Sequence, residues 1–223
     1  MQGTTRQSPI QHLLSPLNPQ WHTIGAGQVA LRFTEIESER RVMRQLGLCD
    51  LSGLAKFGVK GHDAAAWLGS QDITVPDAIF AASCLSGGGF VARFGDNEFF
   101  IEDGIKAATV DSLRRDVAAA TGDVFFVERQ EATLLLTGER SLDVLSQTCA
   151  MNFCAAASGC VIMTRVAGVT CSILPEEVEG VPCYRLWVDA SYAEYLWTAL
   201  LEIAQSLGGD VIDVGCIYPE SLP

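Results

Sequence analysis

"LAKFGVKGHDAAAWL", residues 54–68, and "EATLLLTGERSLDVL", residues 131–145, share one pattern. Apolar residues coincide at four pairs of positions: Phe57/Leu134, Val59/Leu136, Ala65/Leu142 and Leu68/Leu145. Gly61 of the first stretch falls on Gly138 of the second. Period-two alternation before the glycine predicts a strand, and the spacing after it predicts a helix, with the glycine allowing the chain to reverse. The sequence therefore contains an internal repeat.

A second match follows the first in each copy. Residues 98–118 and 184–204 both predict a strand, an aspartate at the turn (Asp103 or Asp189) and a longer amphipathic helix. The distance between the two copies is larger here, and the extra residues fall largely in "PEEVEGVP", residues 175–182. Its prolines, glycine and acidic residues predict a long hairpin loop with a solvated acidic face.

These repeats predict an α+β fold made of two strand-helix-strands-helix units, near residues 28–120 and 124–208. We expect an N-terminal tail over residues 1–25 and one duplicated domain over residues 26–223. Neither unit closes its sheet alone, so the two copies are expected to pack as one pseudo-symmetric body. A helix is predicted over residues 35–46 in the first copy.

Composition limits the classes of partner. Among 223 residues, 27 acidic and 15 basic side chains give a net charge of −12, which opposes binding to nucleic acid or to an anionic membrane. The longest apolar runs are too short to cross a hydrocarbon core of about 30 Å. The N-terminus has no continuous apolar segment typical of a secretion signal. The sequence predicts a cytoplasmic protein without a membrane span.

The eight cysteines form no C-x-x-C pair and match no common zinc pattern, so no metal site is expected. Free cysteine packs as a small apolar residue in a reducing compartment. The alternative is a hydrolase with a catalytic thiol, which needs an activating base. The candidate bases are three histidines: His12, His22 and His62.

The residues around the first repeated strand could pass for an active site, but a structural interpretation is favoured. Asp50 and Ser52 are well suited to fixing a turn. Lys56 and Lys60 lie on the face opposite the apolar residues of their strand, and so are expected to face solvent or a partner. "GGGFVARFG", residues 87–95, has no phosphate-loop pattern and predicts a hairpin.

The N-terminal tail carries apolar residues that no regular element of its own can bury. Pro9, Pro16 and Pro19 prevent a continuous helix. The sequence predicts a partner interface, formed by Ile10, Leu13, Leu14, Leu17 and Trp21. The alternative is a tail that docks on its own domain.

A resemblance to a known family adds to this interpretation. "GLCDLSGLAKFGVKGHDAAAWLGSQDIT", residues 47–74, resembles the N-terminal segment of the folate-dependent T-protein of the glycine cleavage system. Asp50, Ser52, Gly61 and Asp72 fall on matching places. The resemblance implies a fold in which two α+β halves exchange strands around a central cavity.

Two motifs of those enzymes are absent. They carry an Asp-Asp pair, with the catalytic carboxylate, on the strand after a Gly-Gly turn, where this chain has Phe90-Val91-Ala92-Arg93. They also carry a Tyr-Thr-Gly-Glu-x-Gly-Tyr-Glu segment that holds the pterin, in place of which residues 165–188 read "RVAGVTCSILPEEVEGVPCYRLWV". We therefore expect no catalytic and no cofactor-binding residue in this chain.

The chain is more similar to the gamma subunits of heterotetrameric sarcosine oxidases, through its length, "SPIQHLL" at residues 8–14 and residues 184–204. This resemblance implies a structural subunit whose alpha and beta partners carry FAD, FMN, NAD and tetrahydrofolate. The complex would oxidise sarcosine or a related N-methyl amino acid. The alternative is a free-standing folate-binding protein or C1-transfer enzyme.

Overall fold

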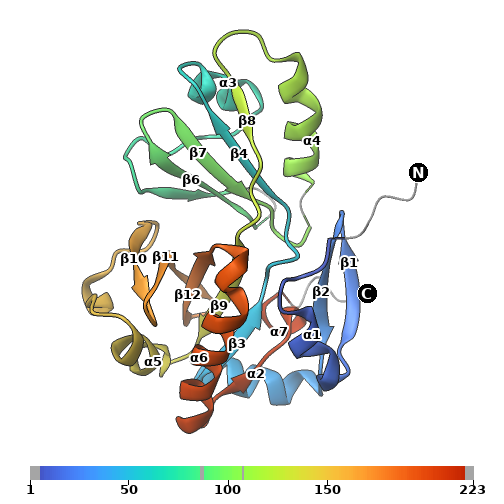
Figure 1. Ribbon diagram of the computed structural model, residues 1–223, viewed down its shortest axis with the longest axis vertical. Coiled ribbons are helices and arrows are strands. Elements are labelled where there is room, and N and C mark those ends of the chain that lie inside the picture. The colour runs from blue at the N-terminus through green and yellow to red at the C-terminus, as the bar shows by residue number, and fades with distance from the viewer. Residues whose placement is uncertain (1–5, 86–87, 107, 219–223) are drawn as a thin grey trace. The chain divides into compact units, whose positions relative to one another are not determined.

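The computed structural model describes residues 6–85, 88–106 and 108–218 (Figure 1). Contacts within the chain divide it into two compact units. Unit 1 takes in the described residues up to Gly53, those of Glu131–Ser158 and those from Ile162 on. Unit 2 takes in the described residues of Leu54–Gln130 and Gly159–Val161. Both units combine helices with largely antiparallel sheets, which confirms the predicted α+β class.

Unit 1 contains a six-stranded sheet and a separate hairpin. In spatial order the sheet consists of β10 (Ile162–Val166), β11 (Val169–Val178), β12 (Val181–Val188), β9 (Ala132–Thr137), β3 (Gly47–Asp50) and β13 (Asp210–Val211). Strands β3 and β13 are parallel, and the other neighbours are antiparallel. The hairpin pairs β1 (Gln20–Ile24) with β2 (Gly27–Arg32).

The helices of unit 1 pack against this sheet, against the hairpin or against one another. They are α1 (Gln11–Leu14), α2 (Ile36–Gln45), α5 (Ser141–Thr148), α6 (Ala193–Ser206) and α7 (Val214–Ile217). Helix α6 contacts α5 and β3, and its Leu196, Trp197 and Leu200 join the core formed by β9 and β12. Of the helices in the part of the chain that the structure describes, none combines the length and apolar character that spanning a bilayer requires.

Unit 2 is built on a five-stranded antiparallel sheet. In spatial order its strands are β5 (Ala82–Cys84), β6 (Phe90–Gly95), β7 (Glu98–Glu102), β4 (Lys56–Lys60) and β8 (Phe125–Val127). Helices α3 (Ala64–Ser70) and α4 (Thr109–Asp116) contact β7 and β4. Phe57, Val59, Phe99 and Ile101 from the two central strands form the core of this unit with Leu68 and Leu113.

The structure confirms the repeated strand-glycine-helix pattern. Strand β4, Gly61 and α3 in one copy correspond to β9, Gly138 and α5 in the other. Both glycines have positive φ angles, 125° and 103°, a region that other residues rarely adopt. Each glycine carbonyl accepts a hydrogen bond from the amide of the first helical residue, Ala64 or Ser141. The same turn is therefore built twice.

The second predicted match is also confirmed. Strand β7 is followed by α4, and β12 is followed by α6. Asp103 and Asp189 lie just after their strands, and each accepts backbone hydrogen bonds near the start of the next helix, from Val110 or Ser191. The predicted helix 35–46 is α2, one residue shorter at each end.

The two compact units do not follow the two sequence repeats. Strands β2 and β3 and helix α2 belong by sequence to the first repeat, yet they lie in unit 1 with the second. Strand β3 pairs there with β9, in the interior of the six-stranded sheet. A strand of the first repeat thus completes the sheet of the second.

The predicted loop over residues 175–182 is wrong. Strand β11 continues to Val178 and β12 begins at Val181, so Glu179 and Gly180 alone form the turn. Their φ angles of 51° and 79° are those of a two-residue turn whose twist suits a hairpin. The acidic composition suggested a solvated loop, but Glu176 forms an ion pair with Arg185 on the neighbouring strand instead of facing water.

The repeated glycines give a test of the turn geometry. Replacing Gly61 or Gly138 with alanine places a Cβ 2.0 Å from the Asp123 carbonyl oxygen or 2.5 Å from the Gln45 carbonyl group. With the positive φ angles, each change is expected to lower the free energy of unfolding by at least about 2 kcal/mol in urea denaturation.

Gly69 is the matched control for this test, because it lies inside α3 with open space around its Cβ position. Gly69→Ala is expected to raise the free energy of unfolding by about 0.5–1 kcal/mol. Equal effects at Gly61, Gly69 and Gly138 would show that the turns do not require glycine.

Candidate functional site

Strand β6 stands where the T-protein resemblance places a pair of aspartates. Its residues Phe90, Val91 and Ala92 are buried and apolar. The strand pairs with β5, and Leu85 donates its amide hydrogen to Gly89, which confirms the predicted hairpin, although Gly87 lies outside the described residues. No side chain of β6 can act as the carboxylate of those enzymes.

A carboxylate instead lies on the neighbouring strand, directly opposite Phe90. Glu102 at the end of β7 pairs in register with Phe90 on one side and with Lys56 of β4 on the other. The Lys56 Nζ atom is 3.3 Å from Glu102 Oε2, and it also donates to the Leu54 carbonyl at 3.1 Å. Neither side chain has any exposed surface. This buried ion pair is the candidate site of unit 2.

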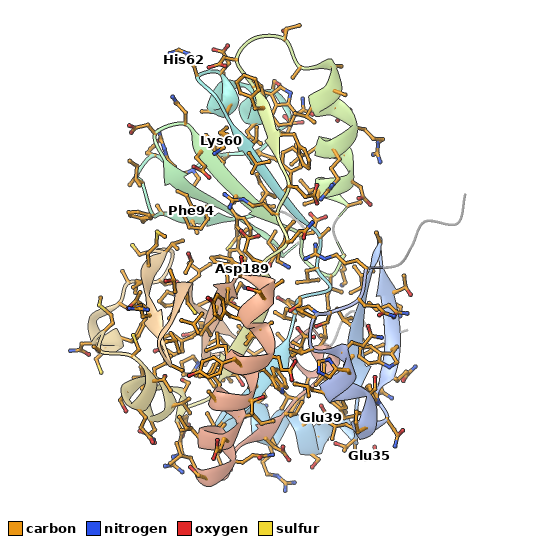
Figure 2. The ribbon with its side chains drawn as sticks, in the orientation of Figure 1. Glu35, Glu39, Lys60, His62, Phe94 and Asp189 are labelled. Atoms are coloured by element: carbon orange, nitrogen blue, oxygen red, sulfur yellow. The ribbon has the colours of Figure 1, made fainter. Side chains whose placement is uncertain are left out.

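The prediction that Lys56 faces solvent or a partner is therefore wrong, whereas Lys60 is half exposed (Figure 2). The two lysines share a face of β4 with Gly58. An added Cβ at Gly58 would come within 2.8 Å of Arg129 Nε. Arg129 lies over the ring of Phe100, 5.7 Å from its centroid, and covers this face. The absent side chain of Gly58 leaves room for Arg129 on this face.

Asp103 follows Glu102 and is the second buried carboxyl group at this end of the sheet. Its two oxygens accept the Val110 amide of α4 at 3.1 and 3.2 Å. Burial raises the pKa of Asp103 to about 6, against the lowering effect of that hydrogen bond. The carboxyl group holds the first turn of α4 against the sheet.

The arrangement fits structural support better than chemistry. Lys56 and Glu102 neutralise each other without contact with solvent, so neither can exchange a proton with a substrate in this conformation. Removing one partner would leave a buried charge uncompensated. The pair holds β4 and β7 in register.

The segment that replaces the pterin-binding motif contains another buried ion pair. Arg185 of β12 is almost fully buried and donates from Nε to Glu176 Oε1 at 2.9 Å and from Nη2 to the Tyr218 hydroxyl at 2.9 Å. Glu176 therefore belongs to the interior, which corrects the predicted acidic surface, whereas Glu177 and Glu179 remain partly or well exposed. The hydrogen bond from Arg185 to Tyr218 attaches the C-terminal segment to the sheet.

The thiols do not favour the hydrolase alternative. All eight cysteines lie in the described part of the chain, and each is free. Burial raises the pKa of Cys171 and Cys183 to about 12 and raises that of Cys49 well above its usual range. A nucleophile needs the opposite shift. These buried thiols are packing residues.

Asp50 and Ser52 fix a turn, as predicted. Ser52 donates its amide hydrogen to Asp50 Oδ1 at 2.9 Å, and its hydroxyl accepts the Thr133 amide at 3.1 Å. The turn thus joins the end of β3 to the start of β9. Its role is to position strands.

The N-terminal segment docks on unit 1. Its prolines do prevent a continuous helix, since α1 ends at Leu14 and a single 3₁₀ turn follows before β1. Ile10 and Leu14 are buried in the core of unit 1, so the prediction that they contact a partner is wrong. Leu13 and Trp21 are partly buried against the same core, and Leu17 is 47% exposed. Ile10 and Leu14 instead anchor the segment.

Residues 17–218 match the family model described as the GCVT N-terminal domain. The chain belongs to this family. An aminomethyltransferase of Moorella thermoacetica is 24% identical to this chain over 190 residues. That match covers 78% of this chain and 51% of the aminomethyltransferase, so the chain spans about half of that relative's length.

Solved structures show the same family fold. The aminomethyltransferase T of the glycine cleavage system from Bartonella henselae superposes with a TM-score of 0.72 at 13% identity, covering 95% of this chain and 60% of that one. A chain of the heterotetrameric sarcosine oxidase from Corynebacterium sp. U-96 superposes with a TM-score of 0.65 at 17% identity. That match covers 92% of this chain and 97% of the oxidase chain.

Sequence reasoning missed the pairing of charged residues within this GCVT-family fold. Lys56 begins β4 and Glu102 ends β7. Because the two strands run antiparallel, the register places these residues side by side. Glu39 and Asp213 also meet, although 174 positions separate them. A lysine at the start of a buried strand was the one available signal.

The buried pair predicts a non-additive effect on stability. Lys56→Met leaves Glu102 buried without its ammonium partner and is expected to lower the free energy of unfolding by about 3–5 kcal/mol. The double variant Lys56→Met/Glu102→Leu removes both charges and is expected to lose less than the single variant. Urea denaturation of the two variants and the wild type measures both. A double variant that is less stable than Lys56→Met would contradict the ion pair.

Proposed function

We propose that this chain is a structural, non-catalytic subunit of gamma type in a heterotetrameric sarcosine oxidase or a related N-methyl amino acid oxidase or dehydrogenase. The observation that carries the proposal is the structural match to a chain of the Corynebacterium sarcosine oxidase, which spans 97% of that chain. The aminomethyltransferase structure, by contrast, is matched over 60% of its length.

The chemistry of the residues supports the same proposal. Strand β6 carries apolar residues where the aminomethyl-transferring relatives are expected to carry a catalytic carboxylate. The nearest carboxylate in register, Glu102, is held by Lys56 without exposed surface. The alpha and beta subunits of the proposed complex would then carry FAD, FMN, NAD and tetrahydrofolate, and this chain would hold none of them.

The second candidate function is folate binding or C1 transfer, favoured by the 24% identity to an aminomethyltransferase. Titration of the full chain with tetrahydrofolate in a calorimeter separates the two. We expect no saturable binding below about 1 mM, that is, an affinity weaker than about −4 kcal/mol.

A micromolar dissociation constant would overturn the non-catalytic proposal. In that case Asp103→Asn tests whether Asp103 belongs to the site, because Asp103 is a buried carboxyl group that directly follows the β7 residue opposite Phe90. A known folate-binding protein titrated under the same conditions shows that the ligand is intact.

The remaining exposed residues of the N-terminal segment are proposed to meet a partner subunit. Leu13 lines a surface groove of about 350 Å³ with Trp197, Leu201 and other residues of α6. Leu17 follows Leu13 in the same segment and is 47% exposed. Apolar side chains at such a rim are available for docking.

A pair of leucine variants tests this interface. Leu17→Ser is expected to leave the free energy of unfolding within about 0.5 kcal/mol and to reduce co-purification with co-expressed flavin-bearing subunits. Leu14→Ala, in the core, is expected to cost about 2–5 kcal/mol in stability. If Leu17→Ser co-purifies like the wild type, Leu17 lies outside the interface.

A further inference from the structure

Two carboxyl groups from distant parts of the chain meet inside unit 1. Glu39 lies in α2 (Figure 2), and Asp213 lies between β13 and α7. They are 3% and 2% exposed. Glu39 Oε2 accepts the Asp213 amide at 2.8 Å, and a carboxyl oxygen of each side chain lies within 4.8 Å of one on the other. Two buried carboxyl groups at this separation favour one proton between them over two negative charges.

The same two groups gather backbone donors from three segments. Glu39 Oε1 accepts the amides of Phe33 and Thr34 at 3.1 and 2.6 Å and the Thr34 hydroxyl at 3.1 Å. Asp213 Oδ2 accepts the Phe33 amide at 3.2 Å, and Oδ1 accepts the Cys216 amide at 2.8 Å. The end of β2, α2 and the start of α7 therefore converge on one pair.

Other hydrogen bonds attach the two ends of residues 210–218. Asp210 and Ile212 donate their amide hydrogens to Leu46 and Leu48 along β3, and Tyr218 accepts from Arg185. Releasing Asp213 would therefore remove the side-chain hydrogen bonds that attach the centre of residues 210–218 to α2 and to the residue after β2.

The surrounding groups include thiols, a further carboxylate and one arginine. Cys216 of α7 lies within 4.8 Å of both carboxyl groups, and burial, this cluster and Asp50 together raise the pKa of Cys49 of β3. Arg40 of α2 is the cation that acts on Cys216, and it also lies 3.8 Å from Glu179. Burial and Glu39 raise the pKa of Asp213 to about 8.

A metal site explains the cluster less well. Glu39, Asp213 and Cys216 could offer one ligand atom each. All four carboxyl oxygens, however, already accept backbone hydrogen bonds, and burial raises the pKa of the Cys216 thiol, which keeps it protonated. These hydrogen-bonded oxygens and this protonated thiol favour a shared proton over a metal ion.

We propose that Glu39 and Asp213 form a proton-dependent latch that fastens residues 210–218 to α2 and β2, and that loses its hold when the shared proton leaves. In alkaline solution two adjacent carboxylates repel each other inside the protein. Deprotonation releases one proton to solvent, and opening then breaks the hydrogen bonds from the Asp213 amide to Glu39 and from the Phe33 amide to Asp213.

The sign of the pH dependence follows from the two states of the chain. An aspartate in the unfolded chain loses its proton near pH 4, whereas the folded pair keeps one until about pH 8. The folded state therefore binds more protons between these values, and its stability falls as pH rises. The stabilisation is fully present below about pH 4, and each pH unit in the window raises the opening equilibrium by up to tenfold.

Hydrogen exchange of the full chain at pH 6 and pH 9, corrected for the intrinsic exchange rate, tests the latch. In the wild type, the protection of residues 210–218 is expected to fall more than tenfold over this range. Asp213→Asn keeps the Oδ1 acceptor and donates permanently to Glu39, so its protection is expected to change less than threefold.

Asp189→Asn is the matched control, because Asp189 is an exposed residue with local hydrogen bonds to Ser191. It is expected to behave as the wild type. Equal pH dependence in the wild type and Asp213→Asn would overturn the latch. If Asp213→Asn does not fold, carboxyl ¹³C shifts of the wild type decide: Asp213 titrating near pH 8 supports the proposal, and titration below pH 5 overturns it.

Discussion

The pairing of β3 with β9 is the contact on which the rest of unit 1 depends. Leu48 lies opposite Leu136, and both belong to the core that α6 covers. The chain leaves unit 1 just after β3 and returns just before β9, and the hydrogen bond between Ser52 and Thr133 joins these two points. Strand β13 then adds to the free edge of β3. One strand of the first repeat thus fixes the sheet of the second and the exit toward unit 2.

Local sequence patterns predict much of this fold. Gly61 and Gly138 identified the repeated turn because positive φ angles and close backbone approach require glycine there. Long-range pairing was not predictable in the same way. Lysine is typical of the surface, and the burial of Lys56 depends on Glu102, which the strand register brings beside it. The ends of β11 and β12 within residues 175–182 were not predicted, because the acidic residues there suggested a loop, whereas Glu176 forms an ion pair with Arg185 of β12.

The buried charges share one character that bears on function. Lys56–Glu102, Glu176–Arg185 and Glu39–Asp213 each join segments that are separate in the sequence, and each is satisfied within the chain. An enzyme of this family is expected to expose a carboxylate to its substrate on the strand that is apolar here as β6. Charges that hold strands together are consistent with a chain whose contribution is shape and contact surface.

We propose that this GCVT-family chain supplies no reacting group to the oxidase complex in which we place it. The most direct test is the turnover of sarcosine, per assembled complex, when the chain carries Lys56→Met/Glu102→Leu. The account predicts a kcat within about twofold of wild type in every complex that assembles, since less than about 0.5 kcal/mol of barrier would change. A complex that assembles fully and turns over a hundredfold more slowly would contradict it.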